Sequence, residues 1–137
     1  MIEITSDDFS VDAVLRRLRD PANGALVAFI GVVRNDTDGH PVDRIEVQAY
    51  REMALRQLTA IRDAALQQFG VNQIAIIHRV GTLAVAENIV LIAVGGAHRE
   101  EAFKACRFIL EELKAKAPLW KKEFTPEGSH WVEDLPP

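Results

Sequence analysis

Two long segments of the chain carry apolar residues at the spacing of an α-helix, and they constrain the fold more than any other feature. The first covers residues 52–69, and Gly70 follows it at the position of a C-terminal cap. The second covers residues 99–116 and is stopped by Pro118. The apolar faces predicted from this spacing are Ala54, Leu58, Ile61, Ala65 and Phe69 in the first segment, and Phe103, Cys106, Leu110, Leu113 and Ala117 in the second.

Shorter apolar segments predict strands around these helices. A further helix is expected over residues 11–19, with Ser10 as its cap. The mixed order of strands and helices predicts an α+β fold, with a single domain over residues 1–137. After Pro118 the tail shows only short apolar pieces around Trp120 and Trp131. The expected strands are residues 2–5, 25–33, 42–50, 73–80 and 89–94.

Composition and charge exclude several classes of protein. Of the 137 residues, 48% are hydrophobic, but the longest apolar run, Ile89–Val94, suits a strand and is far too short to span a membrane. The N-terminus has no basic region followed by an apolar stretch, so no secretory signal is expected. The single cysteine fits a reducing cytoplasm. The net charge of −4 argues against nucleic-acid binding.

Cations nevertheless gather in a few short segments. Residues 114–122 contain four lysines and no acid. His98 and Arg99 follow Gly95-Gly96 at the start of a predicted helix, where unpaired N–H groups favour an anion, and Arg34 follows a predicted strand. Each segment has an ordinary alternative, a solvated helix end or a turn facing water. Together they could assemble a small pocket for an anion.

Other chemistry has little support in the sequence. Cys106 lies on the predicted apolar stripe, so we expect it to be buried and inert. The histidines show no metal-ligand spacing, and no metal is expected. An ordinary lysine is neutral only about 0.04% of the time at pH 7, so Lys114 would need crowding by other cations to become a base or nucleophile.

In its order of short motifs the chain resembles the catalytic (large) subunit of molybdopterin synthase. The resemblance runs from Gly24 to Val132, and its most specific part is Leu113–Glu123, LKAKAPLWKKE. The other segments that carry it are Phe29–Arg34 (FIGVVR), Tyr50 with Met53, His78–Gly81 (HRVG), Ala97–Arg99 (AHR), Pro126–Gly128 (PEG) and Trp131-Val132.

The resemblance implies an α/β-hammerhead fold with a mixed or antiparallel sheet. It also implies a homodimer of this chain that binds two small ubiquitin-like sulfur-carrier subunits in a heterotetramer. The carrier ends in Gly-Gly with a terminal thiocarboxylate. Two sulfurs pass from it to cyclic pyranopterin monophosphate and form the dithiolene of molybdopterin. No other cofactor is implied, because the partner supplies the sulfur.

By position, the resemblance makes Lys114 and Lys121 the catalytic lysines. We expect Lys114 to transfer protons or hold the carrier's acyl group, and Lys121 to stabilise an oxyanion. The remaining residues expected to bind the substrate or the carrier terminus are Val32, Val33, Arg34, His98, Arg99, Lys122 and Glu123.

The chain departs from the family pattern at three positions. Gln48 and Leu55 stand where glutamate is common, and Ala86 stands where glycine is usual. None of the three removes a pocket cation. The alternative function is a non-catalytic module that binds a ubiquitin-like carrier, and the presence of both Lys114 and Lys121 disfavours it.

Overall fold

A mixed four-stranded sheet forms the centre of the molecule, and the computed structural model describes residues 1–132 of the chain. The strand order is β1 (Ile2–Thr5), β6 (Gln73–Arg79), β8 (Asn88–Gly96) and β2 (Ala25–Val32). β1 runs parallel to β6, and the other neighbours are antiparallel. β1 and β2 are therefore the two edges of this sheet.

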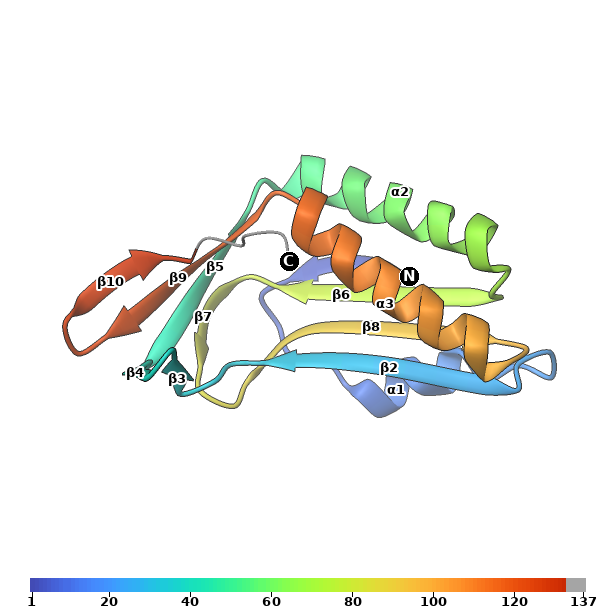
Figure 1. Cartoon of the computed structure of the whole chain (residues 1–137), viewed down its shortest axis with the longest axis horizontal. Helices are drawn as coiled ribbons and strands as arrows, with labels where there is room; N and C mark the ends of the chain where they lie inside the picture. Colours follow the sequence, from blue (N-terminus) through green and yellow to red (C-terminus); the bar gives the residue numbers. More distant parts are fainter. Residues whose placement is uncertain (133–137) are drawn as a thin grey trace.

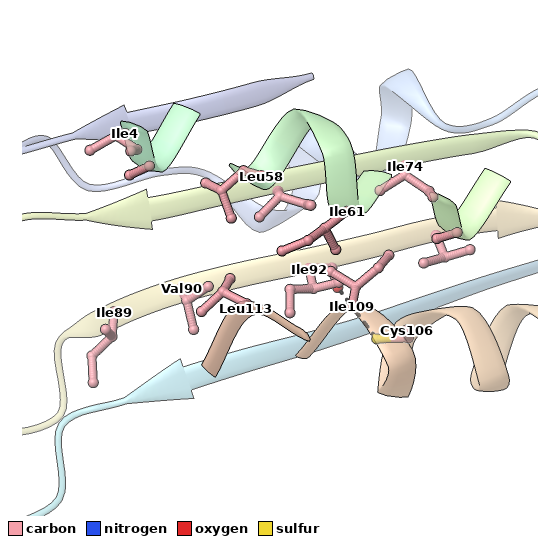
Figure 2. Packing of buried hydrophobic residues seen from close by; sticks show 14 of the residues in the cluster. Ile4, Leu58, Ile61, Ile74, Ile89, Val90, Ile92, Cys106, Ile109 and Leu113 are labelled. Carbon is pink, nitrogen blue, oxygen red and sulfur yellow. Dashed lines mark hydrogen bonds between the residues drawn. The ribbon is translucent and has the colours of Figure 1, made fainter. Parts of the chain in front are cut away.

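Helices cover both faces of the sheet. α2 (Arg51–Phe69) and α3 (Arg99–Lys116) lie side by side on one face, and α1 (Val11–Arg17) lies on the other (Figure 1). The main core fills the space under α2 and α3, where Leu58 and Ile109 are fully buried against Ile92 of β8 (Figure 2). A smaller apolar cluster fills the space beneath α1. α2 ends at Gly70, whose left-handed backbone (φ 66°) a glycine adopts without steric cost.

A second sheet, wholly antiparallel, projects from one end of the first (Figure 1). The chain enters it directly from β6, because only Val80 separates β6 from β7. It enters again after α3, where Pro118 separates the helical segment from β9. The strands in order are β10 (Gly128–Trp131), β9 (Leu119–Thr125), β5 (Arg44–Ala49) and β7 (Gly81–Ala84), with the short pair β3 (Asp36–Thr37) and β4 (His40–Pro41) beside them.

The α+β class is confirmed, as are both long helices and their main buried residues. One helical prediction is wrong: the Phe103 side chain is 63% exposed, because the buried face of α3 is centred on Ala102, Ala105 and Ile109. The tail after Pro118 also differs from the expectation of isolated apolar pieces, since it forms the β9–β10 hairpin. No helix within residues 1–132 is long and apolar enough to cross a membrane.

The structure shows where the three residues that depart from the family pattern lie. Leu55 packs against the main core, and the Gln48 amide donates to the Glu46 carboxylate (3.0 Å). Ala86 turns the chain between β7 and β8 with φ 73°, a left-handed conformation in which an alanine is strained.

Candidate active site

A cavity of about 510 Å³ lies where the first sheet, the end of α3 and the start of β9 meet. Its walls are mainly apolar, with polar and charged groups at a few points. The residues that line it are Phe29, Ile30, Gly31, Val32, Arg34, His78, Ile89, Val90, Leu110, Leu113, Lys114, Ala117, Leu119 and Lys121. Among these residues there are three cationic side chains and one imidazole, and no carboxylate.

The end of α3 explains why two lysines seven positions apart share this cavity. Lys114 lies in the last turn of the helix, next to the buried Leu113. Ala117 leaves helical geometry, so β9 begins at Leu119 and Lys121 lies in it, half-buried. Cations at the C-terminal end of a helix are favoured by the helix dipole.

Arg34 comes to the cavity from another part of the chain, after the end of β2. It follows β2, whose register with β8 shifts between Gly31 and Val32. Gly31 is close to its neighbour strand, since a Cβ there would lie 2.8 Å from Cγ1 of Val90. The cavity therefore has cations from two of the three segments that the sequence predicted for an anion pocket, Arg34 and the lysine segment 114–122.

Val32 and Val33 differ in what they can offer a ligand. Val32 lines the cavity and is 47% exposed. Val33 is buried, and its N–H donates to the Glu87 carbonyl (3.0 Å) while its own carbonyl accepts from Ala86 N–H (2.8 Å). The predicted substrate contact through the Val33 backbone is not favoured by this arrangement, because both groups are already used.

Lys122 and Glu123 adjoin Lys121 in sequence but do not line the cavity. The Lys122 ammonium lies over the Trp131 ring, 5.4 Å from its centroid. The buried Glu123 carboxylate accepts from Thr37 Oγ1 (2.5 Å) and lies 3.2 Å from His130 Nε2. Glu123 thus joins the β3 segment to the β9–β10 hairpin. Its predicted role in substrate binding has no counterpart in this geometry.

His98 and Arg99 lie at the far end of α3. Arg99 is separated from Lys114 by about 22 Å along the helix axis, at 1.5 Å per residue. Both are exposed and line a separate hollow with Gly24, Glu100 and Glu101. Within one copy of the chain, the structure does not bring them to the cavity of Lys114 and Lys121.

His78 is the cavity residue to which the sequence assigned no role. Its side chain is 1% exposed and lines the cavity from β6. Its Nδ1 lies 2.8 Å from the Arg79 carbonyl oxygen. His78 begins the HRVG segment that carries part of the resemblance, but no role was assigned to it, because a histidine at the end of an apolar strand is equally compatible with packing.

Cys106 is buried under α3 and does not line the cavity. Its Sγ lies 3.8 Å from the Ile92 carbonyl oxygen, and burial raises the pKa of the thiol to about 11. The prediction that Cys106 belongs to the core is confirmed. In residues 1–132 no group of three or more His, Cys, Asp and Glu side chains is placed to hold a metal ion.

Comparisons with known proteins agree on one family. Residues 4–116 match the model of the MoaE protein family. Molybdopterin synthase catalytic subunits from Pyrococcus abyssi (39% identity, 93% of this chain, 86% of the relative) and from Nostoc sp. (46% identity, 94% and 79%) are similar over most of their length.

Solved structures show the same fold. The crystal structure of molybdopterin synthase from Staphylococcus aureus superimposes with a TM-score of 0.91 at 33% identity, over 96% of each chain. A complex of subunits 1 and 2 of molybdopterin-converting factor from Helicobacter pylori has the same fold at 19% identity and a TM-score of 0.77, over 96% of this chain and 90% of that one. The chain belongs to the MoaE family, that of the molybdopterin synthase catalytic subunits.

Proposed function

We propose that this chain is the catalytic subunit of a molybdopterin synthase, working in the cytoplasm. In this reaction the thiocarboxylated C-terminus of a small ubiquitin-like carrier gives its sulfur to cyclic pyranopterin monophosphate. Each transfer exchanges one substrate oxygen for sulfur, and the carrier leaves as an ordinary carboxylate. Two transfers give the dithiolene of molybdopterin.

The observation that carries this proposal is the cationic cavity in an acidic chain. Arg34, Lys114 and Lys121 converge on it although the net charge is −4. The carrier terminus and the substrate phosphate are both anions, which cations held at fixed positions attract. A cavity of about 510 Å³ is also within the usual size range of small-molecule sites.

The three cations have distinct roles in this proposal. The Arg34 guanidinium, with its forked donors, binds the phosphate or the carrier terminus. Lys121, held half-buried on β9, stabilises the negative charge that develops on oxygen when the acyl carbon becomes tetrahedral. Lys114 transfers a proton or holds the carrier's acyl group in transit.

In this proposal the partner of the chain is the small carrier that donates the sulfur. Family membership supports it, and the Helicobacter pylori relative was solved as a complex of its two subunits. The buried Cys106 thiol also fits a reaction in which the sulfur comes from outside the chain, because a thiol with a pKa of about 11 is a poor nucleophile at neutral pH.

A second copy of the chain completes the site in this proposal. His98 and Arg99 are too far from the cavity of their own copy to bind there. α3 packs beside the edge strand β2, and Val32 and Phe103 near this edge are 47% and 63% exposed. A second copy in antiparallel orientation along this edge would bring its own His98 and Arg99 to the first cavity. Two copies and two carriers form a heterotetramer.

Mixing of variants tests this arrangement. Lys114→Ala and Arg99→Ala are each expected to be inactive as homodimers. Co-expressed with different tags and purified as a mixed dimer, they restore one intact cavity, and roughly half of the parental activity per dimer is expected. A mixed dimer that is as inactive as its parents would contradict sharing of the site between copies.

The function itself is tested by reconstitution. Purified chain, thiocarboxylated carrier and cyclic pyranopterin monophosphate are expected to give a dithiolene product, detected as its oxidised fluorescent derivative. Carrier with an ordinary C-terminal carboxylate serves as the control and gives none. If the folded complex binds thiocarboxylated carrier and substrate yet forms no dithiolene, the proposed function is wrong.

A further inference from the structure

A short hairpin follows Arg34 in the chain, and its own sequence gives it a defined shape. Asp38 and Gly39 have positive φ angles of 51° and 83°, the two-residue turn that an Asp-Gly pair favours between antiparallel strands. The turn joins β3 to β4, and at the base of the hairpin the Val42 N–H donates to the Asn35 carbonyl (2.9 Å). The hairpin is therefore closed directly after Arg34, so the contacts that hold the hairpin also help to place Arg34.

Hydrogen bonds of two kinds join the hairpin segment, residues 35–43, to β9. The Asp43 N–H donates to the Phe124 carbonyl (2.8 Å), a bond between two backbones that no side chain supplies. The Thr37 hydroxyl donates to the Glu123 carboxylate (2.5 Å). The first bond would remain if Thr37 lost its hydroxyl, whereas the second would not.

The carboxylate that Thr37 contacts is buried. Glu123 is 8% exposed, and burial of an ionised carboxylate is costly unless hydrogen-bond donors meet it. The Thr37 hydroxyl and His130 Nε2 (3.2 Å) are donors to this group. An apolar side chain could fill such a place at lower cost, so a carboxylate there favours one specific arrangement of its partners. If the hairpin moved away, Glu123 would lose a donor, and the contact therefore resists displacement of the hairpin.

This contact lies next to the cavity. Side chains alternate along a strand, so Glu123 is on the same face of β9 as Lys121, about 7 Å further along. Lys121 lines the cavity, and so does Arg34, three residues before Thr37. The hydrogen bond from Thr37 to Glu123 therefore ties the segment that carries one cavity cation to the strand that carries another.

We propose that Thr37 is a positioning residue for Arg34. Its hydrogen bond to Glu123 holds the hairpin against β9, and with the hairpin it holds Arg34 where the guanidinium binds the anionic ligand of the cavity. Thr37 does not line the cavity itself, so it acts through Arg34 and not by touching the ligand. This inference rests on the proposed function, in which Arg34 binds the substrate phosphate or the carrier terminus.

A pair of substitutions at position 37 separates the hydroxyl from the rest of the side chain. Thr37→Val removes the hydroxyl and keeps the shape, whereas Thr37→Ser keeps the hydroxyl. Kinetics with carrier and with cyclic pyranopterin monophosphate first identify the KM that Arg34→Ala raises. Thr37→Val is expected to raise this same KM about tenfold with kcat within about threefold of the parent, because a misplaced binding group weakens ground state and transition state alike. Thr37→Ser is expected to stay within about twofold of the parental KM.

Two further variants guard against effects of packing. Thr37→Ala also lacks the hydroxyl but places no apolar group against the carboxylate, and it is expected to give the same rise in KM as Thr37→Val. Thr125→Val is the matched control, since the hydroxyl of Thr125 donates to the Gly128 carbonyl (2.9 Å) in the β9–β10 hairpin, outside the cavity. This control is expected to leave both KM and kcat unchanged. Circular dichroism and denaturant unfolding confirm that each variant is folded under the assay conditions.

The background of Arg34→Ala shows whether Thr37 acts through Arg34. In that background Thr37→Val is expected to leave the KM unchanged, because the group that it positions is absent. A merely structural role would instead lower the apparent kcat through fewer folded molecules and leave KM at the parental value. Parental KM in folded Thr37→Val and Thr37→Ala, an equally raised KM in Thr37→Ser, or the same rise with and without Arg34 overturns the role of Thr37. Absence of dithiolene from the parent itself overturns the proposed function instead.

Discussion

Lys114 and Lys116 lie in the same turn of α3 and are both exposed, but they have different neighbours. Lys114 lines the cavity, whereas the Lys116 ammonium is 2.6 Å from the Glu112 carboxylate on the solvent side. The two residues are four positions apart, a spacing at which side chains on a helix face each other. An exposed pair of this kind contributes about 0.3–0.5 kcal/mol, so Lys116 matters little to either folding or catalysis.

This difference gives a matched pair of variants. Lys114→Ala is expected to lower kcat by about 100-fold or more, because it removes a charge or proton donor from the cavity itself. Lys116→Ala is expected to turn over within about twofold of the parent and to lose less than about 0.5 kcal/mol of unfolding free energy. Steady-state kinetics and denaturant unfolding of both variants check this. Equal kinetic losses in the two would remove Lys114 from the reaction.

The buried thiol of Cys106 is expected to make the free energy of unfolding depend on pH. Burial raises the pKa of its thiol from 9.0 to about 11 in the folded chain. Between these values the unfolded thiol has released its proton while the folded one keeps it, so the free energy of unfolding falls as the pH rises from 9 to about 11. The contribution is complete below pH 9. In Cys106→Ala this part of the decline is absent, and the stability gap between parent and variant narrows across the window in denaturant titrations. A constant gap would contradict the burial argument.

At the scale of elements, the long helices were predictable from the sequence, whereas of the second sheet only β5 was predicted. The core face of α2 follows directly from its periodicity, because burial and spacing coincide at Leu58 and Ile61. Phe103 was misplaced because a large apolar residue near the stripe of α3 was counted as core, although the smaller Ala102 and Ala105 allow the close approach of the helix. β9 carries charged residues on both faces, Lys122 on one and Lys121 with Glu123 on the other, so alternation alone did not reveal it.

The turn between β7 and β8 contains Ala86, which stands where the family usually has glycine, and its backbone conformation predicts the effect of restoring glycine there. The left-handed backbone conformation costs an alanine about 1–2 kcal/mol of folding free energy, a cost that glycine does not have. Glycine instead lowers the free energy of unfolding by about 0.5–1 kcal/mol, because its unfolded chain has more conformational freedom. Ala86→Gly is therefore expected to stabilise the chain by about 0.5–1 kcal/mol, measured by chemical denaturation. The hydrogen bond from the backbone N–H of residue 86 to the Val33 carbonyl is unaffected by the substitution. Destabilisation by the substitution would show that the turn is not strained.

At the scale of the whole molecule, the sequence predicted the components of the site better than their arrangement. Arg34, Lys114 and Lys121 are brought together by the fold, as expected. His98 and Arg99 are not, because they lie at one end of α3 and Lys114 lies at the other. His78 was missed because a buried histidine in an apolar strand has the same sequence signature whether it packs or reacts.

The central claim is that the cationic cavity moves sulfur from a partner to the substrate. Carrier labelled with heavy sulfur in its thiocarboxylate tests this directly, with the dithiolene product analysed by mass spectrometry. We expect both sulfurs of the product to carry the label, in equal yield from the parent and from Cys106→Ala, and product formation about 100-fold or more slower in Lys114→Ala. Unlabelled sulfur in the product, or label that depends on Cys106, would contradict the account.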